Sequence, residues 1–138
     1  MSDFRLLLLM IFVVSAPPDP ARADRLFRCE AKDAVVLGAD GRIERTVATE
    51  YWRESHNNMI VDTSTGAIRY PEKAEPDRWE IVQAGNASND FVVVPNPAPS
   101  MAATDFLRVR AWAEMKGTVL FIKYGLSMMI TGTCTSIQ

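Results

Sequence analysis

Histidine and cysteine are scarce in this sequence, which has one histidine, His56, and two cysteines, Cys29 and Cys134. A zinc site needs three or four protein ligands, and a hydrolytic triad needs a histidine held by an orienting partner. His56 lies in a polar stretch beside Ser55 and Asn57, where we expect it to be exposed. The sequence therefore predicts no catalytic residue, no metal site and no cofactor, and we expect a protein that is not an enzyme.

The sequence also lacks an excess of basic charge and a long apolar run. Its 15 basic and 17 acidic residues give a net charge of −2, whereas a nucleic-acid-binding protein concentrates basic residues on one face. The only extended apolar run, Leu6–Val14, is shorter than the roughly 20 residues that span a bilayer as a helix. We therefore expect no nucleic-acid partner and no membrane span in the mature protein.

The beginning of the chain is typical of a secretory signal peptide. A weakly positive start, the short apolar run and the ending Ala21-Arg22-Ala23 fit a leader over 1–23. Cleavage after Ala16 and an uncleaved anchor are the alternatives. The prediction is a single β-barrel-like domain over 24–138 that is periplasmic or secreted.

Two cysteines in an exported chain are most simply explained by a disulfide, because that compartment is oxidising. Cys29 lies in the first predicted strand, which begins at Phe27, and Cys134 lies in the last, so the bond would join the two. A reactive cysteine pair is the alternative, but neither Cys-x-x-Cys spacing nor an adjacent histidine supports it.

Short strands and turns account for most of the mature sequence. Residues 27–32 alternate apolar and polar side chains, and Asp40-Gly41 is typical of a tight hairpin. We expect Val35 and Leu37 to continue the inward face, and Ile43 and Val47 to face inward on the returning strand. The full pattern predicts an all-β fold of eight or nine short antiparallel strands, as a small barrel or a sandwich. Neighbouring first and last strands favour the barrel, which has no free edges.

One stretch, 49–58, breaks the strand pattern and resembles one or two helical turns. It carries Tyr51, Trp52, Arg53 and His56, which form a candidate ligand-contacting loop at the barrel mouth. Alternatively, Tyr51 and Trp52 close the end of the barrel as part of its core.

The mature sequence resembles a group of small exported β-proteins of Gram-negative bacteria that have no assigned function. The likeness rests on the aromatic-x-Cys start at Phe27, the Thr-x-x-Gly hairpin at 63–66, the strand that opens at Trp79 and the closing Thr-Gly-Thr-Cys of 131–134. It implies the fold and the disulfide and carries no activity. A looser likeness links the chain to periplasmic lysozyme inhibitors of barrel type, whose Ser-Gly-x-x-Tyr loop is absent here.

One predicted strand carries a distinctive outer face. Two arginines bracketed by aromatic residues could bind an acidic loop or another anion through forked hydrogen bonds; the four residues are Phe106, Arg108, Arg110 and Trp112. The alternative is a purely structural role, in which the arginines lie over apolar side chains on a solvated face. We predict a monomeric, exported protein-interaction module, inhibitor-like or an envelope accessory, with a small-molecule carrier of calycin-like architecture as the alternative.

Overall fold

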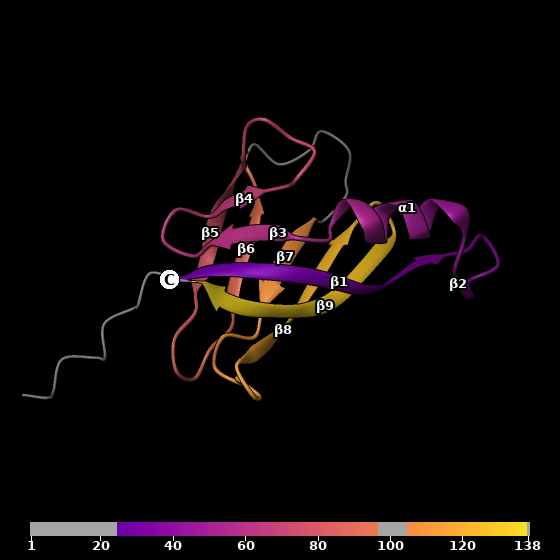
Figure 1. Ribbon diagram of the computed structural model, residues 1–138. Coiled ribbons are helices and arrows are strands. Elements are labelled where there is room, and N and C mark those ends of the chain that lie inside the picture. The colour runs from indigo at the N-terminus through magenta and orange to yellow at the C-terminus, as the bar shows by residue number, and fades with distance from the viewer. Residues whose placement is uncertain (1–24, 97–104, 138) are drawn as a thin grey trace, which may run out of the picture.

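A computed structural model describes residues 25–96 and 105–137 of the chain (Figure 1). The predicted signal peptide, 1–23, lies outside the described residues. The elements are β1 (Leu26–Leu37), β2 (Ile43–Glu44), α1 (Val47–Ser55), β3 (Met59–Asp62), β4 (Ala67–Arg69), β5 (Asp77–Ala84), β6 (Phe91–Pro95), β7 (Phe106–Val109), β8 (Thr118–Gly125) and β9 (Met128–Ile137).

The strands form a closed antiparallel barrel. From β3 to β9 each strand pairs with the next along the chain, β1 pairs with β3, and β9 pairs back onto β1 through ten residue pairs from Leu26–Ile137 to Val36–Met128. Eight strands therefore close the barrel, and β2 is an extra strand on the far end of β1. This arrangement confirms the predicted barrel, and closure removes the edges that an open sheet would expose.

A disulfide lies in the seam that closes the barrel. Cys29 of β1 and Cys134 of β9 are direct cross-strand partners with Cα atoms 3.9 Å apart, and their sulfur atoms are bonded. Both residues are buried, with at most 1% of their surface exposed. The predicted bond between the first and last strands is confirmed.

Alternating side chains fill the middle of the barrel. Seven of the barrel strands contribute buried residues to a single cluster, and Trp79 and Ile81 of β5 pack against it. Its largest fully buried side chains include those of Phe27, Phe91 and Phe121. The inward face predicted for Phe27, Cys29 and Ala31 is confirmed, since all three are buried.

Beyond Ala31 the predicted alternation is wrong. The pairing of β1 with β9 shifts by one residue between Ala31 and Asp33, so Ala34 takes the buried position and Leu37 is 55% exposed. Ile43 and Val47, also predicted to face inward, are 68% and 90% exposed. Ile43 is exposed because β2 pairs only with the end of β1, beside α1 and away from the barrel strands (Figure 1). Val47 is the first residue of α1 and not part of a returning strand.

Helix α1 begins earlier than the sequence pattern indicated. Thr46 is its N-cap: the Thr46 hydroxyl accepts a hydrogen bond from Thr49 N at 3.3 Å, and the Thr49 hydroxyl accepts one from Thr46 N at 2.8 Å. This reciprocal pair satisfies backbone donors that a helix start leaves free. The helix lies against β1 and β9, and Trp52 points from it toward the core.

Candidate functional site

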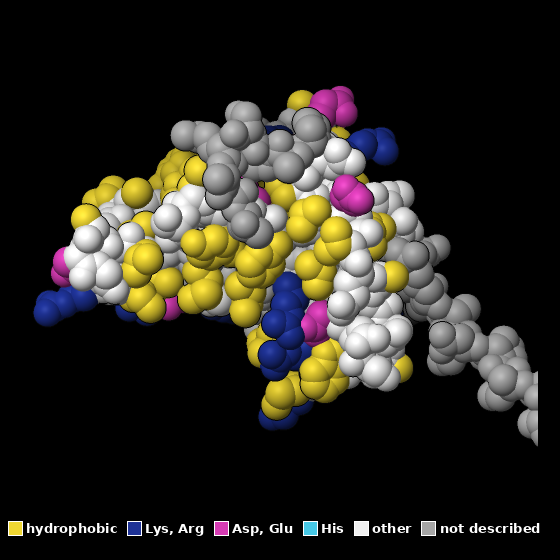
Figure 2. All heavy atoms as spheres, turned by 180° about the vertical axis from the view of Figure 1, so that it is seen from behind, with side chains coloured by type: hydrophobic (Ala, Val, Ile, Leu, Met, Phe, Trp, Pro, Cys, Tyr) yellow, Lys and Arg dark blue, Asp and Glu magenta, His cyan; other side chains and the backbone are white. Residues whose placement is uncertain are grey.

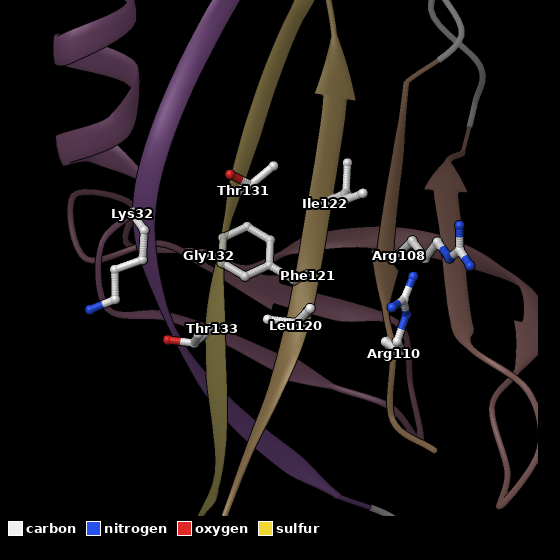
Figure 3. Close-up of a pocket in the computed structure, with 9 residues that line it drawn as sticks. All are labelled: Lys32, Arg108, Arg110, Leu120, Phe121, Ile122, Thr131, Gly132 and Thr133. Carbon is white, nitrogen blue, oxygen red and sulfur yellow. The ribbon is translucent and has the colours of Figure 1, made fainter. Parts of the chain in front are cut away.

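A groove of about 370 Å³ lies on the outer wall of the barrel, across β1, β7, β8 and β9 (Figure 3). Two rows of cross-strand neighbours form its floor. In one row Arg108, Ile122 and Thr131 follow one another across β7, β8 and β9. In the other row, Leu120 of β8 is paired with Thr133 of β9. The backbone N–H of Arg110, which follows the end of β7, donates a hydrogen bond to the Leu120 carbonyl at 2.9 Å. The floor is therefore apolar at its centre and polar toward its sides.

A glycine lets the core reach the floor of this groove. Gly132 of β9 lies opposite Phe121 of β8, and a Cβ atom at that glycine would be 2.6 Å from Phe121 Cε1. It would also collide with the carbonyl oxygen of Glu30 on β1. Any larger residue would have to displace the aromatic ring or separate the strands at this point.

Cationic side chains flank the apolar floor on both sides. Lys32 of β1 lies on one side, and Arg108 and Arg110 lie on the other (Figure 3). Lys32 Nζ pairs with Glu30 Oε2 at 2.6 Å. The guanidinium of Arg110 lies over the indole of Trp112, 5.8 Å from the ring centroid, and pairs with no carboxylate among residues 25–96 and 105–137.

The other arginine is held by an acid that the sequence analysis missed. Asp90, which precedes β6 and is 6% exposed, accepts hydrogen bonds from Arg108 Nε and, at 2.6 Å, from Trp112 Nε1. Its backbone carbonyl accepts a third, from Gln83 Nε2, at 2.7 Å. Asp90 ends a run of turn-forming residues, and the amino-acid sequence gave no sign that it differs from the other polar residues of that turn. It fixes Arg108 and Trp112 at the side of the groove.

The four residues predicted to share one strand face do not all lie together. Arg108, Arg110 and Trp112 do come together, but β7 ends at Val109 and Trp112 lies in the following turn. Phe106 instead stacks on Tyr124, with the ring centroids 5.9 Å apart, one row away from Arg108. Of the two arginines of this face, only Arg110 lacks a carboxylate partner among the described residues.

Apolar side chains gather beside the groove. Leu120 of its floor is 47% exposed, and in the connection between β7 and β8 Trp112 is 48% and Met115 is 71% exposed. Figure 2 shows basic side chains in a hollow on this side of the molecule, bordered by hydrophobic ones. Contiguous exposed apolar surface of this kind is typical of an interaction site.

No family model, curated protein or solved structure matches this chain. Among the described residues, no group of three or more His, Cys, Asp or Glu side chains is placed to hold a metal ion. Within the same ranges no helix is long and apolar enough to cross a membrane.

The second predicted group, Tyr51, Trp52, Arg53 and His56, does not form a common site. Three of its members lie on α1 and the fourth is the C-cap, so the segment is a helix and not a loop. Tyr51 is 64% exposed, and Arg53 pairs with Glu50 on the helix surface. Trp52 packs against the core. The interpretation of a core plug is thus confirmed for Trp52 and wrong for Tyr51.

His56 is buried, contrary to the prediction that it is exposed. It is 3% exposed, its Nδ1 lies 2.8 Å from the Trp52 carbonyl oxygen, and its ring packs edge-on against Tyr70 with centroids 5.0 Å apart. Burial, reinforced by the positive charge of Lys123, lowers the pKa of His56 to about 4. Asn58, with φ of 59°, turns the chain directly into β3, and this tight exit encloses the imidazole.

Proposed function

We propose that this protein is an exported protein-interaction module that binds an acidic, partly apolar segment of a partner protein in its outer groove. The observation that carries the proposal is the apolar floor between cations: Leu120 and Ile122 lie between Lys32 on one side and Arg110 on the other. A partner side chain on the floor would lose water, and acidic groups next to it would meet the flanking cations.

The groove has the size and chemistry for such a segment. Fully burying one Leu-sized or Phe-sized side chain contributes about 1.5–3 kcal/mol, and a few such anchors dominate most protein interfaces. Arg110 presents a planar fork of donors that matches a carboxylate, and the indole beneath it limits its freedom. Asp90 holds Arg108 and Trp112 in place before any partner arrives, which reduces the entropy lost on binding.

Export and a monomeric state are parts of the same proposal. The leader predicted over 1–23 and a disulfide that suits an oxidising compartment support export. The resemblance to small exported proteins of Gram-negative bacteria, and more loosely to barrel-type lysozyme inhibitors, agrees with a periplasmic or secreted partner. The eight strands of the closed barrel offer no edge for pairing between copies, and only the two-residue β2 has a free one, which supports a monomer.

Site-specific crosslinking tests the proposal. A photoreactive phenylalanine analogue replacing Leu120 should crosslink the partner in living cells, and the same analogue replacing Ile43, which is exposed on β2, should not. Mass spectrometry would identify the adduct, and the purified partner would then be titrated against the domain. We expect Arg110→Ala to weaken binding about tenfold, as for loss of a charged hydrogen bond of about 1.5 kcal/mol.

A matched arginine provides the control. Arg69 on β4 lies over a different hollow of the barrel wall, together with Arg28 and Lys73, and it also pairs with no carboxylate among the described residues. Arg69→Ala therefore removes the same charge at a distant surface and should leave the affinity unchanged. Equal losses for Arg69→Ala and Arg110→Ala, or equal crosslinking from positions 120 and 43, would contradict the proposal.

The alternative function, a small-molecule carrier of calycin-like architecture, stays a prediction. Phe27, Phe91 and Phe121 occupy the middle of the barrel, so support for a carrier would have to come from space at the end of the barrel.

A further inference from the structure

Strand β8 directs a lysine into one end of the barrel. Lys123 shares the inward face of β8 with Val119 and Phe121, and its cross-strand neighbours are the buried residues Leu107 and Ile130. Its ammonium lies 5.6 Å from the centroid of the Trp79 ring. No hydrogen bond or ion pair within residues 25–96 and 105–137 engages that ammonium. Lys123 remains partly exposed, so a small molecule can reach it.

A carboxylate faces the same end of the barrel from the adjacent strand. Asp105 immediately precedes β7 and lies over Gly125, where a Cβ atom would be 2.6 Å from Asp105 Oδ1. Gly125 is on the same face of β8 as Lys123, two residues farther along. Asp105 Oδ1 is buried and has no hydrogen-bond partner among the residues that the structure describes. Two opposite charges thus lie at the same end of the barrel without an ion pair between them.

The charged residues near Lys123 and Asp105 form ion pairs with each other and not with these two groups. Lys73 and Asp77 pair with each other at 2.8 Å. The pKa of Lys123 is lowered by burial, while the negative charges of Asp105 and Asp77 oppose that shift. A partly buried donor and a buried acceptor without partners among the described residues are costly, and such groups are normally satisfied by protein, water or ligand.

We propose that this end of the barrel, the mouth site, binds a small carboxylate that carries an amino or hydroxyl group beside the carboxylate and an apolar body. The ligand carboxylate accepts hydrogen bonds from Lys123 Nζ, and its amino or hydroxyl group donates to Asp105 Oδ1. The apolar body packs against the indole of Trp79. The mouth site uses the inner face of β8, whereas the outer groove uses Leu120 and Ile122 of the outer face, so the two proposals stand or fall separately.

Three probes of one carbon skeleton test this assignment: phenylalanine, 3-phenyllactate and 3-phenylpropanoate. They differ only in the amino group, hydroxyl group or hydrogen next to the carboxylate. Each is titrated into the oxidised, ¹⁵N-labelled protein while the amide of Gly125 and the indole N–H of Trp79 are followed by NMR. We expect saturable shifts of both signals, with at least one of the two donor-bearing probes binding about tenfold tighter than 3-phenylpropanoate.

Matched variants assign the two contacts. Lys123→Met, which keeps the length of the side chain and removes its charge, should weaken all three probes about tenfold or more. Asp105→Asn should abolish most of the preference for a donor-bearing probe while leaving 3-phenylpropanoate nearly unchanged. Lys116→Met, at an exposed position of the loop between β7 and β8, should change nothing.

The proposal is overturned if no probe gives a saturable shift of the Trp79 or Gly125 signals up to about 10 mM, a concentration that reveals even weak binding. It is equally overturned if the three probes bind with the same affinity, because Asp105 then makes no contact with the donor.

Discussion

The bond between Cys29 and Cys134 should account for a large part of the stability of the barrel. It joins residues 105 positions apart, and in the chain-entropy model a closed loop of that size restricts the unfolded chain by up to about 4.7 kcal/mol. Residual structure in the unfolded chain reduces this value. We therefore expect the double variant Cys29→Ala/Cys134→Ala to lose about 3–4 kcal/mol of the free energy of unfolding.

Urea unfolding followed by tryptophan fluorescence measures the loss. The variant should remain folded, because ten residue pairs between β1 and β9 still close the barrel. The dependence of the free energy on urea should become steeper, since an unlinked unfolded chain exposes more surface. A reducing agent that affects only the parent protein is the internal control. A loss below about 1 kcal/mol would refute the reasoning and show that the unfolded chain gains little freedom without the bond.

Three further predictions concern single side chains. Asp90→Asn should lower the free energy of unfolding by about 1–2 kcal/mol, measured by urea unfolding. The hydrogen bonds from Arg108 and Trp112 lose a charged acceptor, and water partly compensates for this loss at Arg108, which is partly exposed. His56 has a pKa of about 4 in the folded state, against 6.5 for a free histidine, so it binds its proton more readily when the chain is unfolded. The free energy of unfolding should therefore fall by roughly 2–3 kcal/mol as pH falls from about 6.5 to 4. Subtracting the same pH series for His56→Gln isolates this loss from carboxylate titration, and parallel curves would contradict it. Lys123→Met should raise the thermal midpoint of the ligand-free protein, because it removes a partly buried charge that lacks an ion pair among the described residues. An unchanged midpoint would mean that water already satisfies the ammonium.

The barrel and its disulfide could be predicted because they depend on features that the sequence displays directly. A period of two identifies strands, and cysteines in the first and last strands require those strands to be neighbours. The errors arose where one residue changed the periodicity. The irregularity between Ala31 and Asp33 moved the buried position to Ala34, and the pattern gives no sign of such a shift before the pairing with β9 is known.

The candidate site could be predicted only where it follows a strand. Arg108 and Arg110 were found by their alternation along β7 and its continuation. Asp90 bonds Arg108 and Trp112 from a turn 18 residues earlier in the chain than Arg108, and no local pattern indicates that contact. The burial of His56 depends on its packing against Tyr70, a contact between residues far apart in the sequence that no local pattern indicates. Lys123 could have been noticed, since it shares its parity with Val119 and Phe121. A lysine near a strand end is usually interpreted as extending its ammonium into water, so its position on the inward face is easily overlooked.

The closing seam also determines how the molecule can be held. Leu26 at the start of β1 is paired with Ile137 at the end of β9, so the two ends of the folded domain are immediate neighbours. Lys123 is paired with Ile130, which lies about 23 Å along β9 from that end. A tether attached at either end of the described domain therefore holds the barrel at the same end, away from Lys123. Surface immobilisation through one terminus or the other should give equivalent orientations, a practical advantage for measuring what binds at each surface.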